Sequence, residues 1–309
     1  YDGGVIVLDK ESGTVLSPEE FPELLDYKGL TLLTTDGKTL LGADDKAGVA
    51  EIMTMAETLL REALPHGEIR IVFTTDEEVG RGTEGLDVDE LGCQWAYTVD
   101  GGPLGEYEYE NFNAASAVVC FHGVGIHPGS AKDIMKNAAT IAMEYHVLLP
   151  AEQVPERTEG YEGFIHLTDM RGNVVNAELR YIIRDHDRGE FEKKKALMVE
   201  AAEVINRRYG ADTASLELRD SYYNMKEKIL PHPHLLRRIE AAFRAEGIEP
   251  EAKAIRGGTD GAVLTWMGLP CPNLSTGGYN YHGVQEFIPT DSLEIMPKVL
   301  IHLVRSFTE

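Results

Sequence analysis

The sequence predicts an α/β protein that carries an inserted α+β domain, and two observations lead to this fold class. In the first third of the chain and again after Pro231, apolar runs of strand length alternate with amphipathic segments, which is typical of an α/β sheet. Between residues 111 and 224 the expected elements follow the order βαββαβ, the signature of a ferredoxin-like domain. We therefore expect an α/β domain formed by residues 1–110 and 225–309, interrupted by residues 111–224.

Composition agrees with a folded protein of this size. The chain has 309 residues, 43% of them hydrophobic, which is enough for a packed core and suggests two domains. Its net charge is −23 and its pI about 4.8. Nucleic acids and anionic membranes bind basic patches, so the charge argues against both as partners. The surplus carboxylates suit either metal binding or simple solubility, and charge alone does not separate the two.

Cysteine usage and hydropathy indicate a cytoplasmic protein. Cys93, Cys120 and Cys271 show no pairing or C-x-x-C spacing and lie in apolar surroundings, so we expect buried free thiols in a reducing compartment. No apolar stretch is long enough to span a bilayer, and no signal peptide is visible. The chain begins with Tyr1 rather than Met, which leaves open that it is a fragment of a longer protein.

In the first segment, short apolar runs predict strands at residues 5–8, 15–16, 31–34, 39–41, 69–75 and 95–99. Asp36-Gly37 lies between two of these runs and predicts a β-hairpin. Apolar residues at helical spacing predict a helix over residues 49–63. The continuous apolar run from Ile69 to Phe73 predicts a fully buried strand of a parallel sheet.

The inserted segment has strands expected at residues 114–121, 164–170, 175–183 and 214–218 and helices at 131–149 and 191–209. The pair of central strands is joined by a turn at Gly172-Asn173. After Pro231 we expect a helix over residues 234–246, a short helix ending at Trp266, a strand at 271–275 and a helix at 293–307. Pro297 should kink the last helix or delay its start.

The segment Thr74–Gly80 carries three consecutive acids directly after the apolar run. Ligands of open α/β sheets bind at the carboxyl ends of strands, so these acids lie at an expected site. Because adjacent residues point to different sides, Glu78 could bind a metal while Glu77 carries a proton. Taken alone, such a run is more typical of a solvated loop.

Asp44, Asp100 and His282 also lie at loop positions next to expected strands or helices. Carboxylates with an imidazole suit zinc or a similar divalent ion, and two ions sharing one carboxylate would suit this number of ligands. A carboxylate that is not a ligand must then carry the proton of water, and Glu77 fits that role. The alternatives are that Asp44 only caps a helix and that His282 is an ordinary loop histidine. The spacing thus predicts a metallohydrolase and leaves its substrate open.

Other candidates are weaker. A tight turn explains the residues around His127, and Arg184 and Arg256 could simply pair with surplus acids. Arg256-Gly257-Gly258 lacks the Lys-Ser/Thr of a phosphate-binding P-loop. The chain contains no G-x-S-x-G element and no cysteine in the setting of a nucleophile.

The chain also contains longer motifs that can be compared with those of known protein families. These motifs are Leu41–Gly48, Thr75–Gly80, Tyr97–Gly102, Ile126–Gly129, Ile255–Gly261 and Thr276–Gly283. Together they resemble the di-zinc exopeptidase family, which includes carboxypeptidase G and succinyl-diaminopimelate desuccinylase. Residues 111–115, 159–164 and 220–225 favour its tripeptide aminopeptidases. The resemblance covers essentially the whole chain, and it implies a zinc-binding catalytic α/β domain with an inserted ferredoxin-like lid.

The resemblance also implies roles for the acidic residues. Asp44 would bridge two zinc ions, Glu78 and His282 would complete one site, Asp100 would serve the other, and Glu77 would be the general base and acid. The implied activity is release of the N-terminal residue from tripeptides. The alternatives are a related di-zinc exopeptidase acting on dipeptides or N-acyl amino acids, and a peptide-binding relative without catalysis.

In the inserted domain, His127 matches a lid histidine that helps to polarise the scissile carbonyl and often reaches a neighbouring subunit's site in dimeric relatives, so a homodimer through the lid is an expectation. Arg184 and Arg256 match positions expected to hold the carboxylate end of the peptide, a task that suits the bidentate guanidinium.

One part of the family pattern is missing. The family carries an earlier His-x-Asp motif whose His binds the second zinc, and no His precedes His66 in this chain. We therefore expect the polypeptide as given to lack the N-terminal segment of the catalytic domain, to be weakly stable and to be inactive, whereas the complete protein would bind two zinc ions per subunit and be active.

Overall fold

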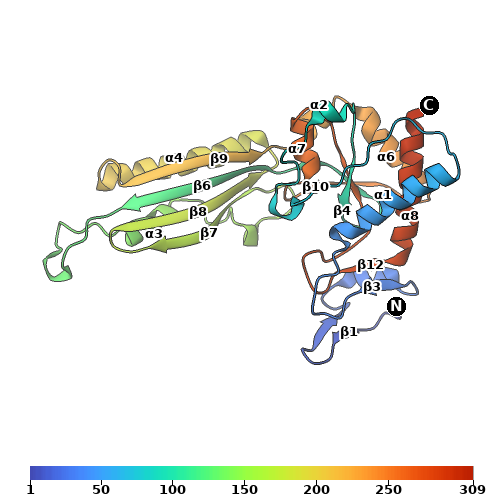
Figure 1. The fold of residues 1–309 in the computed structure, drawn as a ribbon. Helices are drawn as coiled ribbons and strands as arrows, with labels where there is room; N and C mark the ends of the chain where they lie inside the picture. Colours follow the sequence, from blue (N-terminus) through green and yellow to red (C-terminus); the bar gives the residue numbers. More distant parts are fainter. Residues whose placement is uncertain (309) are drawn as a thin grey trace. The chain divides into compact units, whose positions relative to one another are not determined.

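The computed structural model describes residues 1–308, which divide into two compact units (Figure 1). The first unit comprises residues 1–109, 225–253 and the described residues from 259 onward. The second comprises residues 110–224 together with the short segment 254–258. The fold class is α/β with an α+β insertion, as the sequence predicts.

The main sheet of the first unit has the strand order β10-β5-β11-β4. Its strands are β10 (Glu251–Ile255), β5 (Glu106–Asn111), β11 (Asn273–Ser275) and β4 (Thr98–Gly101). Strand β11 pairs with β4 in parallel and with β5 in antiparallel orientation. The sheet and the helices α1 (Ala43–Arg61), α6 (Pro233–Ala245) and α8 (Thr290–Arg305) share one hydrophobic core.

Helix α1 lies unusually close to β4, and a glycine makes this possible. A Cβ atom at Gly48 would lie 2.1 Å from the carbonyl oxygen of Val99, so no other residue fits without displacing the backbone. The contact brings the start of α1, with Asp44, close to the end of β4, with Asp100.

A smaller layer is formed by β1 (Ile6–Asp9) with β2 (Thr14–Leu16) and by β3 (Leu32–Thr34) with β12 (Phe287–Pro289). The predicted hairpin around Asp36-Gly37 is wrong, because β3 pairs with β12 from the far end of the chain and residues 39–41, which the structure describes, form no strand. The local turn is instead closed by the Thr35 hydroxyl, which donates to the Thr39 carbonyl oxygen at 3.0 Å.

The prediction of a buried parallel strand at Ile69–Phe73 is also wrong. The segment pairs with no other strand among residues 1–308. Only Ile69 is partly buried, and the side chains from Arg70 to Phe73 are exposed, Phe73 by 50%. An apolar run indicates burial only where a neighbouring strand and a covering layer contact it, and neither is a property of the run itself.

Smaller differences have local causes. Strands β5, β10 and β12 were not predicted, because charged residues interrupt the first two and the third has only three residues. Helix α8 begins at Thr290 and continues through Pro297, so the proline does not delay its start. All three cysteines are free, but only Cys271 is buried, whereas Cys93 and Cys120 are partly exposed.

The second unit is a ferredoxin-like domain. Its elements are β6 (Asn113–His122), α3 (Ala138–Val147), β7 (Phe164–Gly172), β8 (Asn176–Asp185), α4 (Arg188–Tyr209) and β9 (Ala214–Tyr222), in the sheet order β7-β8-β6-β9. All neighbours are antiparallel, and α3 and α4 share the core with the sheet. Helix α3 starts seven positions later than predicted because the Asn137 side chain caps it, accepting from the N–H groups of residues 139 and 140.

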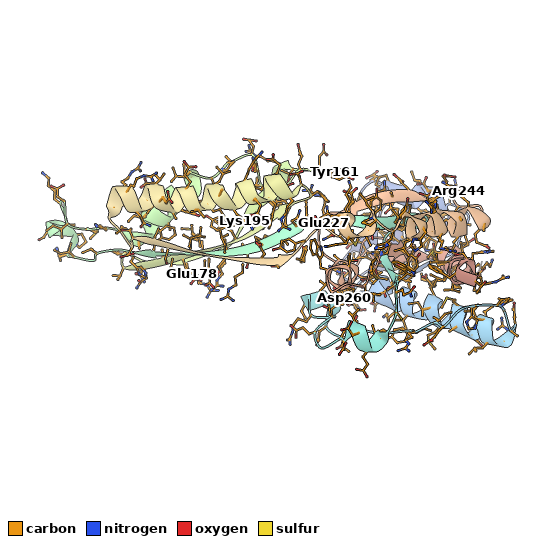
Figure 2. All side chains as sticks on the ribbon, turned by 90° about the horizontal axis from the view of Figure 1, so that it is seen from above. Tyr161, Glu178, Lys195, Glu227, Arg244 and Asp260 are labelled. Atoms are coloured by element: carbon orange, nitrogen blue, oxygen red, sulfur yellow. The ribbon has the colours of Figure 1, made fainter. Side chains whose placement is uncertain are left out.

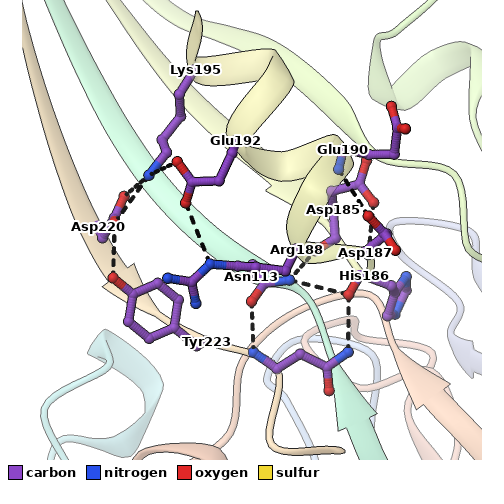
Figure 3. Close-up of polar contacts among 11 residues, drawn as sticks. Asn113, Asp185, His186, Asp187, Arg188, Glu190, Glu192, Lys195, Asp220 and Tyr223 are labelled. Atoms are coloured by element: carbon purple, nitrogen blue, oxygen red, sulfur yellow. Dashed lines mark hydrogen bonds and ion pairs between the residues drawn. The ribbon is translucent and has the colours of Figure 1, made fainter. Parts of the chain in front are cut away.

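A buried polar network holds the entry and exit segments of the second unit (Figure 3). The Asn113 side chain donates to the carbonyl oxygens of Asp185 and His186 at 3.0 and 3.1 Å and accepts from the Asn224 N–H at 3.0 Å. Nearby, the buried Lys194 ammonium lies 2.6 Å from the Asp185 carboxylate. Both ends of the insertion are thereby fixed to the connection between β8 and α4.

Candidate metal centre and active site

Three side chains from distant parts of the chain converge in the first unit. Asp44 lies at the start of α1, Glu78 in a 3₁₀ turn at Glu77–Val79, and His282 in the loop between β11 and β12. The His282 Nε2 atom is 2.9 Å from Asp44 Oδ2 and 3.2 Å from Glu78 Oε2. One ligand atom from each of the three lies within 4.8 Å of the other two.

Asp100, at the end of β4, faces the same group. Burial raises the pKa of Asp100 to about 9, helped by the charges of Asp45, Asp44 and Glu77 and by a hydrogen bond with Asp44. Carboxylates crowded in this way repel one another, and a divalent cation among them would offset the repulsion. Two carboxylates and an imidazole within ligating distance, with a further carboxylate alongside, fit zinc or a similar ion.

Glu77 adjoins these residues but is not part of the converging triad. Burial raises its pKa, and the charges of Asp260, Glu78 and Asp44 add to the effect, which His282 partly offsets. A carboxyl group whose pKa is shifted upward toward neutrality is suited to accepting and returning a proton.

The loop that carries Glu77 and Glu78 is fixed by Asp260, the first residue of α7 (Asp260–Trp266), which is labelled in Figure 2. The Thr74 hydroxyl donates to Asp260 Oδ2 at 3.0 Å. At the other end of the loop, a Cβ atom at Gly82 would lie 2.1 Å from the same oxygen, so the backbone packs directly on the carboxylate. Sequence reasoning gave Asp260 no role, although it lies in the motif Ile255–Gly261.

Backbone turns present the acidic side chains. Gly42 is left-handed, with φ of 66°, and Asp44 and Asp45 depart from helical φ and ψ angles. Asp76 and Gly80, on either side of the 3₁₀ turn, are left-handed as well. His282 has a φ of 62°, uncommon for a residue other than glycine. Unusual backbone of this kind concentrates at functional sites.

Glu51 is a buried acid near this site that sequence reasoning missed. It is 1% exposed on α1, and neither carboxylate oxygen has a hydrogen-bond partner among residues 1–308. Burial raises its pKa to about 9, with a smaller contribution from Asp45. The sequence does contain a pattern that predicts the burial of Glu51, since helical spacing places it in the same buried stripe as Ala47, Met55 and Leu59.

Glu51 should make stability depend on pH. The pKa of Glu51 is higher in the folded than in the unfolded state. Its contribution to the free energy of unfolding is therefore fully present below about pH 4.5 and is lost as the pH rises toward 9. We expect Glu51→Gln to increase the free energy of unfolding at pH 8 by on the order of 2 kcal/mol and to leave it nearly unchanged at pH 5. Urea unfolding in the presence of a chelator measures both values.

The matched control for this prediction is Glu57→Gln, because Glu57 lies on the same helix and is exposed. It should change stability little at either pH. An equal effect of Glu51→Gln at pH 5 and pH 8 would contradict the assigned protonation.

The three residues predicted to bind substrate all belong to the second unit, and they are His127, Arg184 and Arg256. The two terminal nitrogens of Arg256 donate to the carbonyl oxygens of Thr158, Gly160 and Glu162, and its guanidinium lies 5.1 Å from the centre of the Phe112 ring. Arg256 therefore supports the loop at residues 158–162 and pairs with backbone carbonyls rather than with surplus acids.

Arg184 and His127 are also engaged locally. Arg184 donates to the carbonyl oxygens of Ala115 and Ile183 at 3.2 and 2.9 Å and lies over the Tyr222 ring. His127 is exposed, and its Nδ1 atom accepts from the Gly129 N–H at 3.1 Å in a 3₁₀ turn. Their suggested roles in holding substrate stay predictions.

Comparison with known proteins identifies relatives for nearly the whole chain. The model of peptidase family M20/M25/M40 matches residues 34–306. A protein named peptidase T from Geobacillus kaustophilus is 53% identical over all of this chain, which spans 75% of that relative's length. Among residues 1–308, no helix has the length and apolar character needed to cross a membrane.

Solved structures show the same fold. The aminopeptidase PepT of Bacillus cereus matches with a TM-score of 0.79 and 24% identity, over 91% of this chain and 77% of that one. A tripeptidase from Staphylococcus aureus matches with a TM-score of 0.79 and 22% identity, over 89% and 74%. A dinuclear metal-binding M20 peptidase from Bacillus subtilis matches with a TM-score of 0.64 and 16% identity, over 84% and 71%.

Proposed function

The chain belongs to peptidase family M20/M25/M40, and from this premise we propose that it is a zinc-dependent aminopeptidase that releases the N-terminal residue of tripeptides. The observation that carries the proposal is the convergence of Asp44, Glu78 and His282, with the Glu77 carboxylate alongside. Relatives named peptidase T and structural neighbours described as an aminopeptidase and a tripeptidase support the substrate class.

The residues that would hold the metal are Asp44, Glu78, His282 and Asp100. Two zinc ions per subunit would share the Asp44 carboxylate, a ligand count in keeping with the dinuclear relative from Bacillus subtilis. When bound, zinc lowers the pKa of water toward about 7 and polarises the peptide carbonyl group.

Glu77 would carry the proton. It accepts a proton from the attacking water and donates it to the nitrogen of the leaving peptide, so that one carboxyl group serves as base and then as acid. The upward shift of its pKa by burial and by neighbouring acids supports this role, because a less acidic carboxyl group returns the proton more readily. A peptide-binding protein without catalysis would have no need of such a group.

Cationic groups would hold the carboxylate end of the substrate. Arg184 and Arg256 are the proposed cationic groups and His127 the proposed partner of the scissile carbonyl oxygen. A substrate site of fixed length would select peptides of three residues. We further propose a cytoplasmic location and assembly of a homodimer through the second unit.

A panel of peptides tests the proposal on the full-length protein supplied with zinc. We expect kcat/KM for tripeptides to exceed that for dipeptides and tetrapeptides by about tenfold or more, because a site of fixed length leaves polar groups unpaired with the wrong substrate. Acetylation of the N-terminus should abolish cleavage. Equal cleavage of dipeptides, or release of acyl groups from N-acyl amino acids, would instead favour a related di-zinc exopeptidase.

A further inference from the structure

We propose that Glu286 is a positioning residue that sets the distance between Asp44 and His282 in the candidate metal centre. The inference rests on the proposed function, because the distance matters only if these side chains bind a metal. Glu286 lies in the loop before β12 and is 1% exposed. Its contacts all lie within the first unit.

The backbone around Asp44 lacks the support of a regular helix. Gly42 is left-handed, and neither Asp44 nor Asp45 has helical φ and ψ angles. The first N–H groups of a helix also have no partner within the helix itself. The position of the Asp44 carboxylate therefore depends on contacts from outside α1.

Glu286 provides these contacts at two points. Its Oε2 atom accepts from the Gly42 N–H at 2.6 Å, and its Oε1 atom accepts from the Asp44 N–H at 3.2 Å. A carboxylate at the N-terminal end of a helix is electrostatically favourable as well. Both oxygens bond to the backbone, so the carboxylate supports a ligand residue rather than acting as a ligand.

The same loop carries His282. Its two ends are joined by Tyr279 and Phe287, whose N–H and carbonyl groups pair at 2.9 and 3.1 Å. Within it, the Gly283 N–H bonds to the Asn280 carbonyl oxygen and the Glu286 N–H to the Gly283 carbonyl oxygen, both at 3.2 Å. Because the loop is closed in this way, fixing Glu286 to Asp44 also fixes His282 relative to Asp44.

A second attachment ties the loop to the strand that bears Asp100. The Tyr281 hydroxyl donates to the carbonyl oxygen of Gly101, the residue after Asp100, at 3.0 Å, and accepts from the Gly278 N–H at 3.1 Å. The loop at residues 276–286 is thus bonded both to the segment that carries Asp44 and to the strand that carries Asp100. The 2.9 Å separation of His282 Nε2 and Asp44 Oδ2 is the expected result.

Replacing Glu286 by Gln tests the inference on the full-length protein. Glutamine offers one oxygen where two N–H groups need acceptors, so one contact to the Asp44 segment is lost. We expect the affinity for Co²⁺, measured by chelator competition, to fall by about 10- to 100-fold, the usual effect of removing a group that orients a metal ligand. The visible spectrum of bound Co²⁺ should change as well.

The matched control is Glu294→Gln, an exposed glutamate nearby on α8, which should leave Co²⁺ affinity and spectrum unchanged. Thermal unfolding of the metal-free proteins distinguishes positioning of the ligands from a purely structural role of Glu286. A purely structural role would lower the melting temperature without changing the Co²⁺ spectrum. If Glu286→Gln does not fold, Glu286→Asp replaces it as the test, because aspartate keeps the charge on a shorter side chain. Glu286→Asp should weaken Co²⁺ binding by a smaller factor than the loss expected for Glu286→Gln.

The outcomes separate the two proposals. A folded Glu286 variant with the affinity and spectrum of the wild type would overturn the positioning role and leave the proposed function intact. A wild type that binds Co²⁺ tightly and cleaves no peptide would overturn the proposed aminopeptidase activity, while the Glu286 comparison would still stand. A wild type that binds no metal would overturn both.

Discussion

Glu77→Gln should lower kcat of the full-length enzyme by about 10²- to 10⁴-fold while zinc binding is retained, because glutamine cannot accept and return the proton of the attacking water. The substitution keeps the size of the side chain, so the loop held by Asp260 should keep its conformation. Steady-state kinetics with a tripeptide, together with zinc content per subunit, measures the two effects separately.

The control for Glu77→Gln is Glu84→Gln in the following segment. Glu84 is exposed and pairs with Arg81, so its replacement should leave turnover close to that of the wild type. Turnover by Glu77→Gln at the wild-type rate would refute the role of Glu77 as proton carrier. A parallel loss of zinc would instead identify Glu77 as a metal ligand.

The ferredoxin-like unit was predictable from the sequence because its pattern is local. The alternation of Ala177, Leu179, Tyr181 and Ile183 along β8 directs these side chains to one face of the sheet, and the structure buries all four. Errors are confined to boundaries such as the start of α3, where a polar side chain at Asn137 decides which residue begins the helix.

The first unit was harder to predict because its sheet depends on distant partners. Strand β3 could pair with residues 39–41 or with β12, and nothing in the local sequence favours a partner more than 250 residues away. The run Ile69–Phe73 has the composition of a buried strand, yet all of its side chains except the partly buried Ile69 are exposed. Burial is decided by what packs against a segment, which an apolar run does not specify.

The ligand-type residues were easier to select than the groups that orient them. Asp44, Glu78, Asp100 and His282 stand out because acids and a histidine at the ends of elements suit a metal, and the structure brings them together. Glu286 and Asp260 are acids of the same kind, and only their contacts with the backbone and with Thr74 distinguish them from the candidate ligands.

Asp44→Asn should have opposite effects on metal binding and on the stability of the metal-free protein. Asp44 contributes charge to a crowded acidic site, where it helps to raise the pKa of Asp100. We expect zinc affinity to fall by more than about 100-fold, beyond the loss caused by removing a group that only supports a ligand, and peptide cleavage to be lost with it.

Without metal, the same substitution should not destabilise the fold. It removes one of several mutually repelling carboxylates, so the free energy of unfolding in chelator at pH 8 should equal or exceed that of the wild type. Adding zinc at about 100 times its dissociation constant should then stabilise the wild type by about 2.7 kcal/mol and the variant hardly at all. A merely disruptive substitution would lower both the free energy of unfolding in chelator and the stabilisation by zinc. A free energy that is unchanged or higher, together with loss of the stabilisation by zinc, would therefore identify Asp44 as a metal ligand. A variant that zinc still stabilises to the wild-type extent would exclude that role.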